Sequence, residues 1–272
     1  MLSPQAEQMI YEYLNLPFKD IAGIRCPYLN NSRHNQRGQL RVLVGKGTPA
    51  EIVEEAHIIS VHYHNGLFDK NGNCCLHNDH IHHPAAVEKI RRFLIDNNLG
   101  IECSGFVTQV LRVHFQETKQ KDIVNEMRLV NPARLLRWLI SRLRPVENIN
   151  VKTYADSRNS IFVIDAKKAF DPAALQAGDF IILLETGPGN KRNHIILIRD
   201  IQKNVVNYVH ARAWTNEGQF GHGVSEGTIT ISKPKAGILE QTWEENGFTG
   251  NKNETYLEAK QAKTFEIRRL KA

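Results

Sequence analysis

The chain has 272 residues, of which 41% are hydrophobic and 24% are charged. This composition is typical of a folded globular protein and excludes disordered and collagen-like chains. The formal net charge is +6, but the basic residues are spread along the chain, so we expect no nucleic-acid partner. No apolar run approaches the ~20 residues of a membrane span, and residues 1–18 lack the apolar stretch of a signal peptide. Both features favour a cytoplasmic protein, unless the chain is truncated or is exported without a signal.

The four cysteines do not have the spacing of a disulfide framework, because two of them are adjacent. They are Cys26, Cys74, Cys75 and Cys103. So few cysteines in a chain of this length indicate free thiols in a reducing compartment.

Helical patterns predominate before residue 160. Residues 4–14 read as a short helix. Thr48, Pro49 and Glu51 predict a helix start with a capping box, followed by a helix to about residue 60. Further helices are predicted over 84–97 and 131–143. Residues 1–99 are interpreted as an N-terminal helical extension, and residues 100–272 as the core, together forming one integrated domain.

Period-two patterns replace helical ones after residue 160. Strands are predicted over 178–185, 193–200, 205–213, 227–233 and 264–270. Turn-rich stretches separate them at 186–190, 216–223 and 244–253. A helical front half followed by antiparallel strands predicts an α+β fold.

Cys103 lies where a helix is expected to begin. Gly100 ends the preceding helix, and apolar residues then recur with helical spacing at Phe106, Val107, Val110, Leu111 and Phe115. A helix N-terminus has unpaired backbone N–H groups and a positive dipole end, and both favour the thiolate of a cysteine. Ser104 and Gly105 are small, and backbone N–H groups there suit an oxyanion. The same pattern is also compatible with a buried structural cysteine.

Two histidines in the second half supply a candidate base and its orienting partner. His194 opens one predicted strand and His210 ends the next. The two positions are symmetric about Gln202, so a simple hairpin would place them face to face. One imidazole then takes the thiol proton, and the other fixes its ring. Each histidine taken singly also fits a polar residue of a sheet surface.

Four segments resemble the NlpC family of papain-like cysteine peptidases. They are residues 102–107 (ECSGFV), 175–181 (LQAGDFI), 194–198 (HIILI) and 208–211 (YVHA). They are similar, in this order, to the family's nucleophile motif, the strand before its histidine, its histidine strand and the strand of its third residue. Residue 102 is Glu where the family has Asp, and an upstream Pro-Tyr of the family is matched by Cys26-Pro27-Tyr28.

This resemblance implies a fold, an activity and a set of site residues. The fold is a papain-like α+β domain, with the nucleophile helix packed on an antiparallel sheet or half-barrel. The activity is thiol-dependent cleavage of amide bonds, most often in bacterial cell-wall stem peptides or muropeptides, without a cofactor or a metal. Cys103 is the expected nucleophile, His194 the base and His210 the third catalytic residue. Tyr28 and Ser104 are expected at the oxyanion site, and Trp214 along the substrate cleft.

A histidine-rich segment leaves a different function open. His57, His62, His64, His77, His80, His82 and His83 crowd one stretch, together with Cys74, Cys75 and Asp79. These are zinc-ligand types, but their spacing matches no common zinc pattern. The alternatives are therefore a zinc-binding protein, a papain-like amidase, acyltransferase or deamidase acting on a substrate outside the cell wall, and a non-enzymatic binding module.

Overall fold

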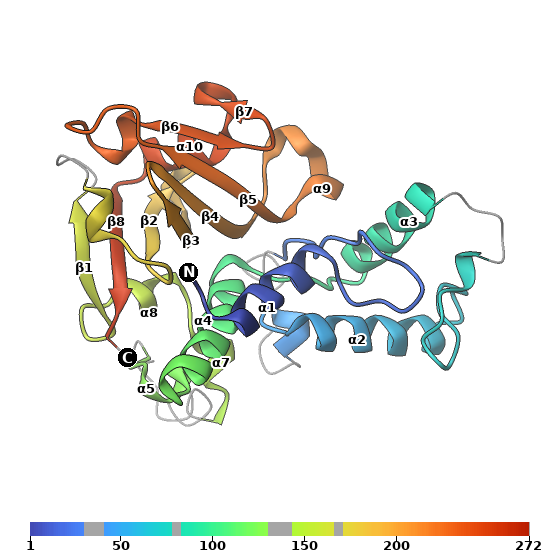
Figure 1. The fold of residues 1–272 in the computed structure, drawn as a ribbon. Coiled ribbons are helices and arrows are strands. Elements are labelled where there is room, and N and C mark those ends of the chain that lie inside the picture. Colours follow the sequence, from blue (N-terminus) through green and yellow to red (C-terminus); the bar gives the residue numbers. More distant parts are fainter. Residues whose placement is uncertain (30–40, 78–82, 130–142, 166–170, 272) are drawn as a thin grey trace. The chain divides into compact units, whose positions relative to one another are not determined.

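The computed structural model describes residues 1–29, 41–77, 83–129, 143–165 and 171–271 (Figure 1). The chain divides into two compact units. The first comprises Met1–Ala6, Cys103–His210 and Ser225–Ala272, and the second comprises Glu7–Glu102 and Ala211–Val224. The boundary expected after residue 99 stays a prediction. The helix expected over 131–143 lies almost entirely outside the described residues.

The described part of the first unit is built on one eight-stranded sheet, whose strands follow the order β1-β8-β2-β3-β4-β5-β6-β7. The strands are β1 (Ser160–Asp165), β2 (Phe180–Thr186), β3 (Arg192–Gln202), β4 (Val205–Arg212), β5 (Gly223–Thr230), β6 (Thr242–Glu245), β7 (Phe248–Thr249) and β8 (Thr264–Leu270). Figure 1 shows β8, the last strand of the chain, between β1 and β2. β8 pairs antiparallel with both neighbours, as β2 does with β3 and β3 with β4. The predicted α+β class is thus confirmed.

The hairpin of β3 and β4 differs from the predicted one. Gln202 pairs with Val205, so the turn is shorter than expected, and the register shifts between Ile198 and Asp200 before Leu197 pairs with Val209. Continuing this register places His210 opposite Ile196. The prediction that His194 directly faces His210 is therefore wrong, because the hairpin turns at residues 203–204 and not at Gln202. A bulge, which adds one residue to β3, corrects this offset only in part. The two histidines are instead diagonal neighbours on one side of the sheet.

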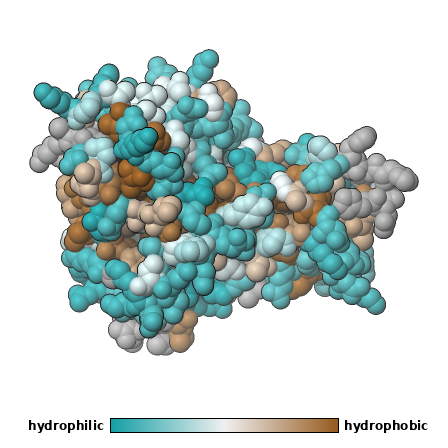
Figure 2. Space-filling view, viewed as in Figure 1, coloured by the Kyte–Doolittle hydropathy of each residue, from teal (hydrophilic) through white to brown (hydrophobic). Residues whose placement is uncertain are grey.

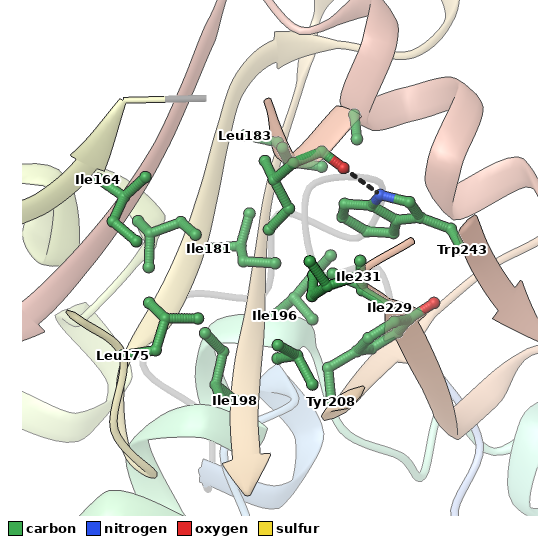
Figure 3. Packing of buried hydrophobic residues seen from close by; sticks show 14 residues of the cluster. Ile164, Leu175, Ile181, Leu183, Ile196, Ile198, Tyr208, Ile229, Ile231 and Trp243 are labelled. Carbon is green, nitrogen blue, oxygen red and sulfur yellow. Dashed lines mark hydrogen bonds between the residues drawn. The ribbon is translucent and has the colours of Figure 1, made fainter. Parts of the chain in front are cut away.

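A hydrophobic cluster covers one face of this sheet (Figure 3). Alternate residues of the strands supply it, including Ile181 of β2, Ile196 of β3 and Tyr208 of β4. This is the period-two pattern that a strand with one buried face requires. Trp243 of β6 lies in the cluster, and its indole Nε1 donates a hydrogen bond of 3.0 Å to the Ile238 carbonyl.

Helices of the first unit pack against the sheet or against one another. Their bounds are α4 (Cys103–Lys119), α5 (Ile123–Glu126), α7 (Pro145–Asn148), α8 (Val151–Ala155) and α10 (Glu254–Gln261). α4 packs against β3, α8 against β2 and β3, and α10 against β2. The Asn253 side chain accepts from the Tyr256 backbone N–H and caps α10.

Helices predominate in the described part of the second unit. They are α2 (Pro49–His62), α3 (His83–Asp96) and α9 (Gly218–Gly221), joined by most of α1 (Pro4–Leu14). The capping box predicted at the start of α2 is confirmed. The Thr48 hydroxyl accepts from the Glu51 backbone N–H at 3.3 Å, and the Glu51 carboxylate accepts from the Thr48 N–H at 2.8 Å.

Hydrophilic side chains cover much of the face seen in Figure 2, with hydrophobic residues scattered among them, as is usual for protein surfaces. Within the described ranges, no helix combines the length and apolar character that crossing a membrane would need.

Candidate active site

Cys103 is the first residue of α4, as the sequence predicts. Its side chain is largely covered, since the residue is 6% exposed, and none of the four cysteines forms a disulfide. The first N–H groups of a helix have no partner within the helix and lie at its positive dipole end. A thiolate at this position is stabilised by both features.

The first turn of α4 is fixed by a pair of buried hydroxyl groups. Thr108 Oγ1 donates to the Ser104 carbonyl at 2.6 Å and lies 2.8 Å from the Tyr154 hydroxyl of α8. Because the single hydroxyl proton of Thr108 goes to the carbonyl, the Tyr154 hydroxyl is the donor of the second bond. Burial raises the pKa of Tyr154 far above its ordinary value, so this donor keeps its proton. The residue after Cys103 is thereby tied to α8.

His194 and His210 are in direct contact. Nε2 of His194 lies 2.6 Å from Nδ1 of His210, and the ring centroids are 4.9 Å apart. Both residues are buried, with exposures of 6% and 0%. The two histidines that the sequence pairs are thus in contact, although the expected strand register is wrong.

A third buried group, Glu245, contacts the far side of His210. Its Oε2 lies 3.1 Å from Nε2 of His210 and also accepts from the Tyr208 hydroxyl at 3.0 Å and the Thr255 hydroxyl at 2.9 Å. The Glu245 side chain is fully buried. We use the name polar chain for the series His194–His210–Glu245.

Sequence reasoning missed Glu245, because it lies in a stretch that reads as turn-rich. A signal is present in the alternation of residues 242–245 (TWEE). Trp243 and Glu245 are both buried, whereas Thr242 and Glu244 are exposed. Glu245 pairs across the sheet with Gly227, a long-range contact that no local pattern predicts.

Tyr28 and Trp214 belong to the second unit, whereas Ser104 and the other expected site residues belong to the first. Tyr28 is half-buried, and its backbone N–H donates to the His222 carbonyl at 3.4 Å. Trp214 is only 2% exposed, and the guanidinium of Arg212 lies 3.9 Å from the centroid of its ring. The roles expected for Tyr28, Ser104 and Trp214 stay predictions.

The histidine-rich segment forms no metal site in the part of the chain that the structure describes, where no group of three or more His, Cys, Asp or Glu residues is placed to hold an ion. His57 instead packs against the rings of Phe18 and Phe68. Three of the other residues weighed as zinc ligands, Asp79, His80 and His82, lie outside the described residues.

The polar chain has the chemistry of a base with a fixed ring. An imidazole held by a second imidazole, which is itself held by a carboxylate, can take up a proton in a defined orientation. A cysteine at a helix N-terminus is a suitable nucleophile for such a base. Comparison of the chain with protein-family models, with curated proteins and with solved structures finds no match.

Proposed function

We propose that this protein is a thiol hydrolase in which Cys103 is the nucleophile and His194 is the base. The observation that carries the proposal is the buried 2.6 Å contact between the two imidazoles of His194 and His210. His194 lies on β3, the strand against which α4 packs, and α4 begins with Cys103. Burial of two imidazoles costs free energy, because each ring nitrogen needs its own hydrogen-bond partner. A buried histidine pair therefore favours a role in a reaction over a purely structural one.

The proposed reaction begins with proton transfer from the Cys103 thiol to His194. The thiolate attacks the carbonyl carbon of an amide, and backbone N–H groups at the start of α4 stabilise the oxyanion. The C–N bond breaks, the amine leaves with the proton from His194, and a thioester remains on Cys103. A water molecule then loses a proton to His194 and attacks the thioester, which releases the acid and restores the thiol.

The substrate class comes from the resemblance of residues 102–107, 175–181, 194–198 and 208–211 to the NlpC family. It favours amide bonds in peptidoglycan stem peptides or muropeptides, in a papain-like fold with His210 as the third catalytic residue. Digestion of purified muropeptides, followed by mass spectrometry, tests this part. We expect loss of an amino acid or peptide with the wild type and no reaction with Cys103→Ala. An active thiol without muropeptide cleavage would move the proposal to another amide or acyl-transfer substrate.

The pairing of Cys103 with His194 is tested by alkylation. The rate at which iodoacetamide modifies Cys103 is measured against pH by mass spectrometry, in the wild type and in His194→Ala. We expect the apparent pKa of Cys103 in the wild type to lie well below about 8.5, the ordinary value of a thiol, and the variant to lose this shift. A thiol that is inert, or that reacts identically in both proteins, would remove the central support of the proposal.

A further inference from the structure

Glu245 is a buried carboxylate for which the proposed reaction gives no direct role. Its Oε2 accepts from three side chains, on β4 and on α10, at distances between 2.9 and 3.1 Å. The donors are Tyr208, Thr255 and His210. Such a site costs free energy unless every donor is aligned, so a role in stability alone would be served as well by an apolar residue.

The hydrogen positions in this network follow from an inventory of donors. Tyr208 and Thr255 each have one hydroxyl proton, and both donate it to Oε2 of Glu245. Nε2 of His210 approaches the same acceptor, so it carries a proton and donates as well. In the neutral ring, Nδ1 of His210 then has a lone pair and accepts.

The same inventory of donors and acceptors assigns the proton of His194. Nε2 of His194 lies 2.6 Å from Nδ1 of His210, and an accepting Nδ1 requires Nε2 of His194 to be the donor. Neutral His194 therefore keeps its basic lone pair on Nδ1. This is the nitrogen that faces away from His210 and the one that a thiol proton must reach.

We infer that Glu245 is a positioning residue, which fixes the tautomers of His210 and His194 and makes Nδ1 of His194 the basic atom. The effect on reactivity rests on the proposed function, whereas the tautomers do not. When His194 takes up a proton, the buried ring becomes a cation, which is costly in a low-dielectric interior. A carboxylate two groups away, connected by aligned hydrogen bonds, offsets part of this cost.

The tautomers are measured directly from the ¹⁵N chemical shifts of the histidine rings in labelled protein, at a pH where both rings are neutral. We expect His194 and His210 both to carry the proton on Nε2. In Glu245→Gln the amide can donate as well as accept, so we expect a mixture of tautomers for His210. A proton on Nδ1 of either ring in the wild type would overturn the inference, whatever the reactivity of Cys103.

The effect on reactivity is measured as the alkylation rate of Cys103 at neutral pH. We expect Glu245→Gln to lower it about tenfold or more, because loss of a tautomer-fixing carboxylate weakens the base. The control is Glu244→Gln, which removes the same charge from an exposed neighbour on the same strand. It should stay within about threefold of the wild type.

Three results separate the possibilities. If Glu245→Gln has the wild-type rate and the wild-type tautomers, Glu245 is not a positioning residue. If Glu245→Asp restores much of the rate while Glu245→Gln does not, the carboxylate is required, as inferred. If wild-type Cys103 reacts like a free thiol, the proposed function fails, and the ¹⁵N measurement still decides the tautomer assignment. Circular dichroism confirms for each variant that the fold is retained.

Discussion

Cys26 and Cys103 are both buried thiols, but their backbone contexts differ. Cys26 is completely buried, and burial raises its pKa far above the ordinary value, although the guanidinium of Arg91 opposes the effect in part. Its Sγ lies 3.6 Å from the Pro27 carbonyl. Cys103 instead begins a helix. Burial alone therefore does not distinguish the two thiols, and it is the helix-initial position that supports Cys103 as the proposed nucleophile.

We expect native Cys26 to resist iodoacetamide at pH 8, because a raised pKa leaves almost no thiolate there. Cys75, which is partly exposed, provides the reference within the same molecule. Peptide mapping by mass spectrometry before and after denaturation in guanidinium checks the prediction. Labelling of Cys26 in the native protein at the rate of Cys75 would contradict it.

His57 makes the stability of the protein depend on pH. Its Nε2 is buried without a hydrogen-bond partner in the described structure. Burial lowers the pKa of His57, and the Asp69 carboxylate partly opposes this. The unfolded chain, with a histidine pKa of about 6.5, therefore binds the proton more readily. The stability from this site is present above that pH and is lost as the pH falls through the folded-state pKa.

Replacement of His57 by Phe tests this pH dependence. The new ring keeps the aromatic contacts with Phe18 and Phe68 and cannot titrate. We expect urea denaturation to show that the variant loses less stability than the wild type between pH 8 and pH 5. His62→Phe, at an exposed position of the same helix, should follow the wild-type pH dependence. Parallel wild-type and His57→Phe curves would contradict the prediction.

Among the elements, the start of α4 depends on the hydroxyl of Thr108, although threonine has a low helix propensity. Thr108 joins the Ser104 carbonyl to the Tyr154 hydroxyl. Thr108→Val keeps the shape but leaves the buried Tyr154 donor without its acceptor. We expect a loss of about 1–3 kcal/mol in the free energy of unfolding, measured by urea denaturation.

Thr118 provides a matched control on the same helix. It makes the same kind of bond, to the His114 carbonyl at 2.7 Å, but is exposed. Water can replace the bond there, so Thr118→Val should change stability by no more than about 0.5 kcal/mol. Equal losses for the two variants would show that burial does not set the contribution of this bond.

A buried arginine holds separate segments of the second unit to α3. The Arg91 guanidinium donates to the carbonyls of Arg25, Phe220 and His222 at 2.5–3.0 Å. Burial lowers the pKa of Arg91 to about 10, so the group is still charged at neutral pH. A lysine cannot reproduce this planar set of donors.

We therefore expect Arg91→Lys to destabilise the protein by about 1–3 kcal/mol, since three half-buried carbonyls lose donors. Arg92→Lys is the control, because Arg92 is exposed and forms an i,i+4 ion pair with Glu88. Its substitution should cost no more than about 0.5 kcal/mol. Thermal or urea denaturation measures both, and a neutral Arg91→Lys would contradict the assignment.

The elements that the sequence predicts are those with strong local signals. The helix over 4–14, the capped start of α2 and the last strand over 264–270 are confirmed, because caps and period-two alternation act within a few residues. β1, β6, β7 and α10 were not predicted. Thr242–Glu245 is only four residues long, and its place in the sheet depends on pairing with β5. The same distinction applies to the site, where local motifs identify His194 and His210 but only tertiary pairing adds Glu245.

Neither of the two units is formed by a single continuous stretch of the chain. The chain passes from one unit to the other after residues 6, 102, 210 and 224. The second unit therefore depends on a short piece from late in the sequence. The Val224 N–H donates to the Cys26 carbonyl at 3.1 Å, and Pro27 forms an antiparallel bridge with Gly223. The carbonyls of Phe220 and His222 complete the contacts of Arg91.

This arrangement predicts how a fragment of residues 1–102 behaves. Without residues 211–224, the Arg91 guanidinium and the Cys26 carbonyl lose the hydrogen-bond partners that they have in the full chain. A synthetic peptide of residues 211–224 should bind the fragment and raise its thermal midpoint, by the equivalent of ~2.7 kcal/mol at 100 times its Kd. A scrambled peptide of the same composition should have no effect, and Arg91→Leu in the fragment should weaken the response. A fragment whose melting is unchanged by the peptide would show that residues 211–224 contribute little to the stability of the second unit.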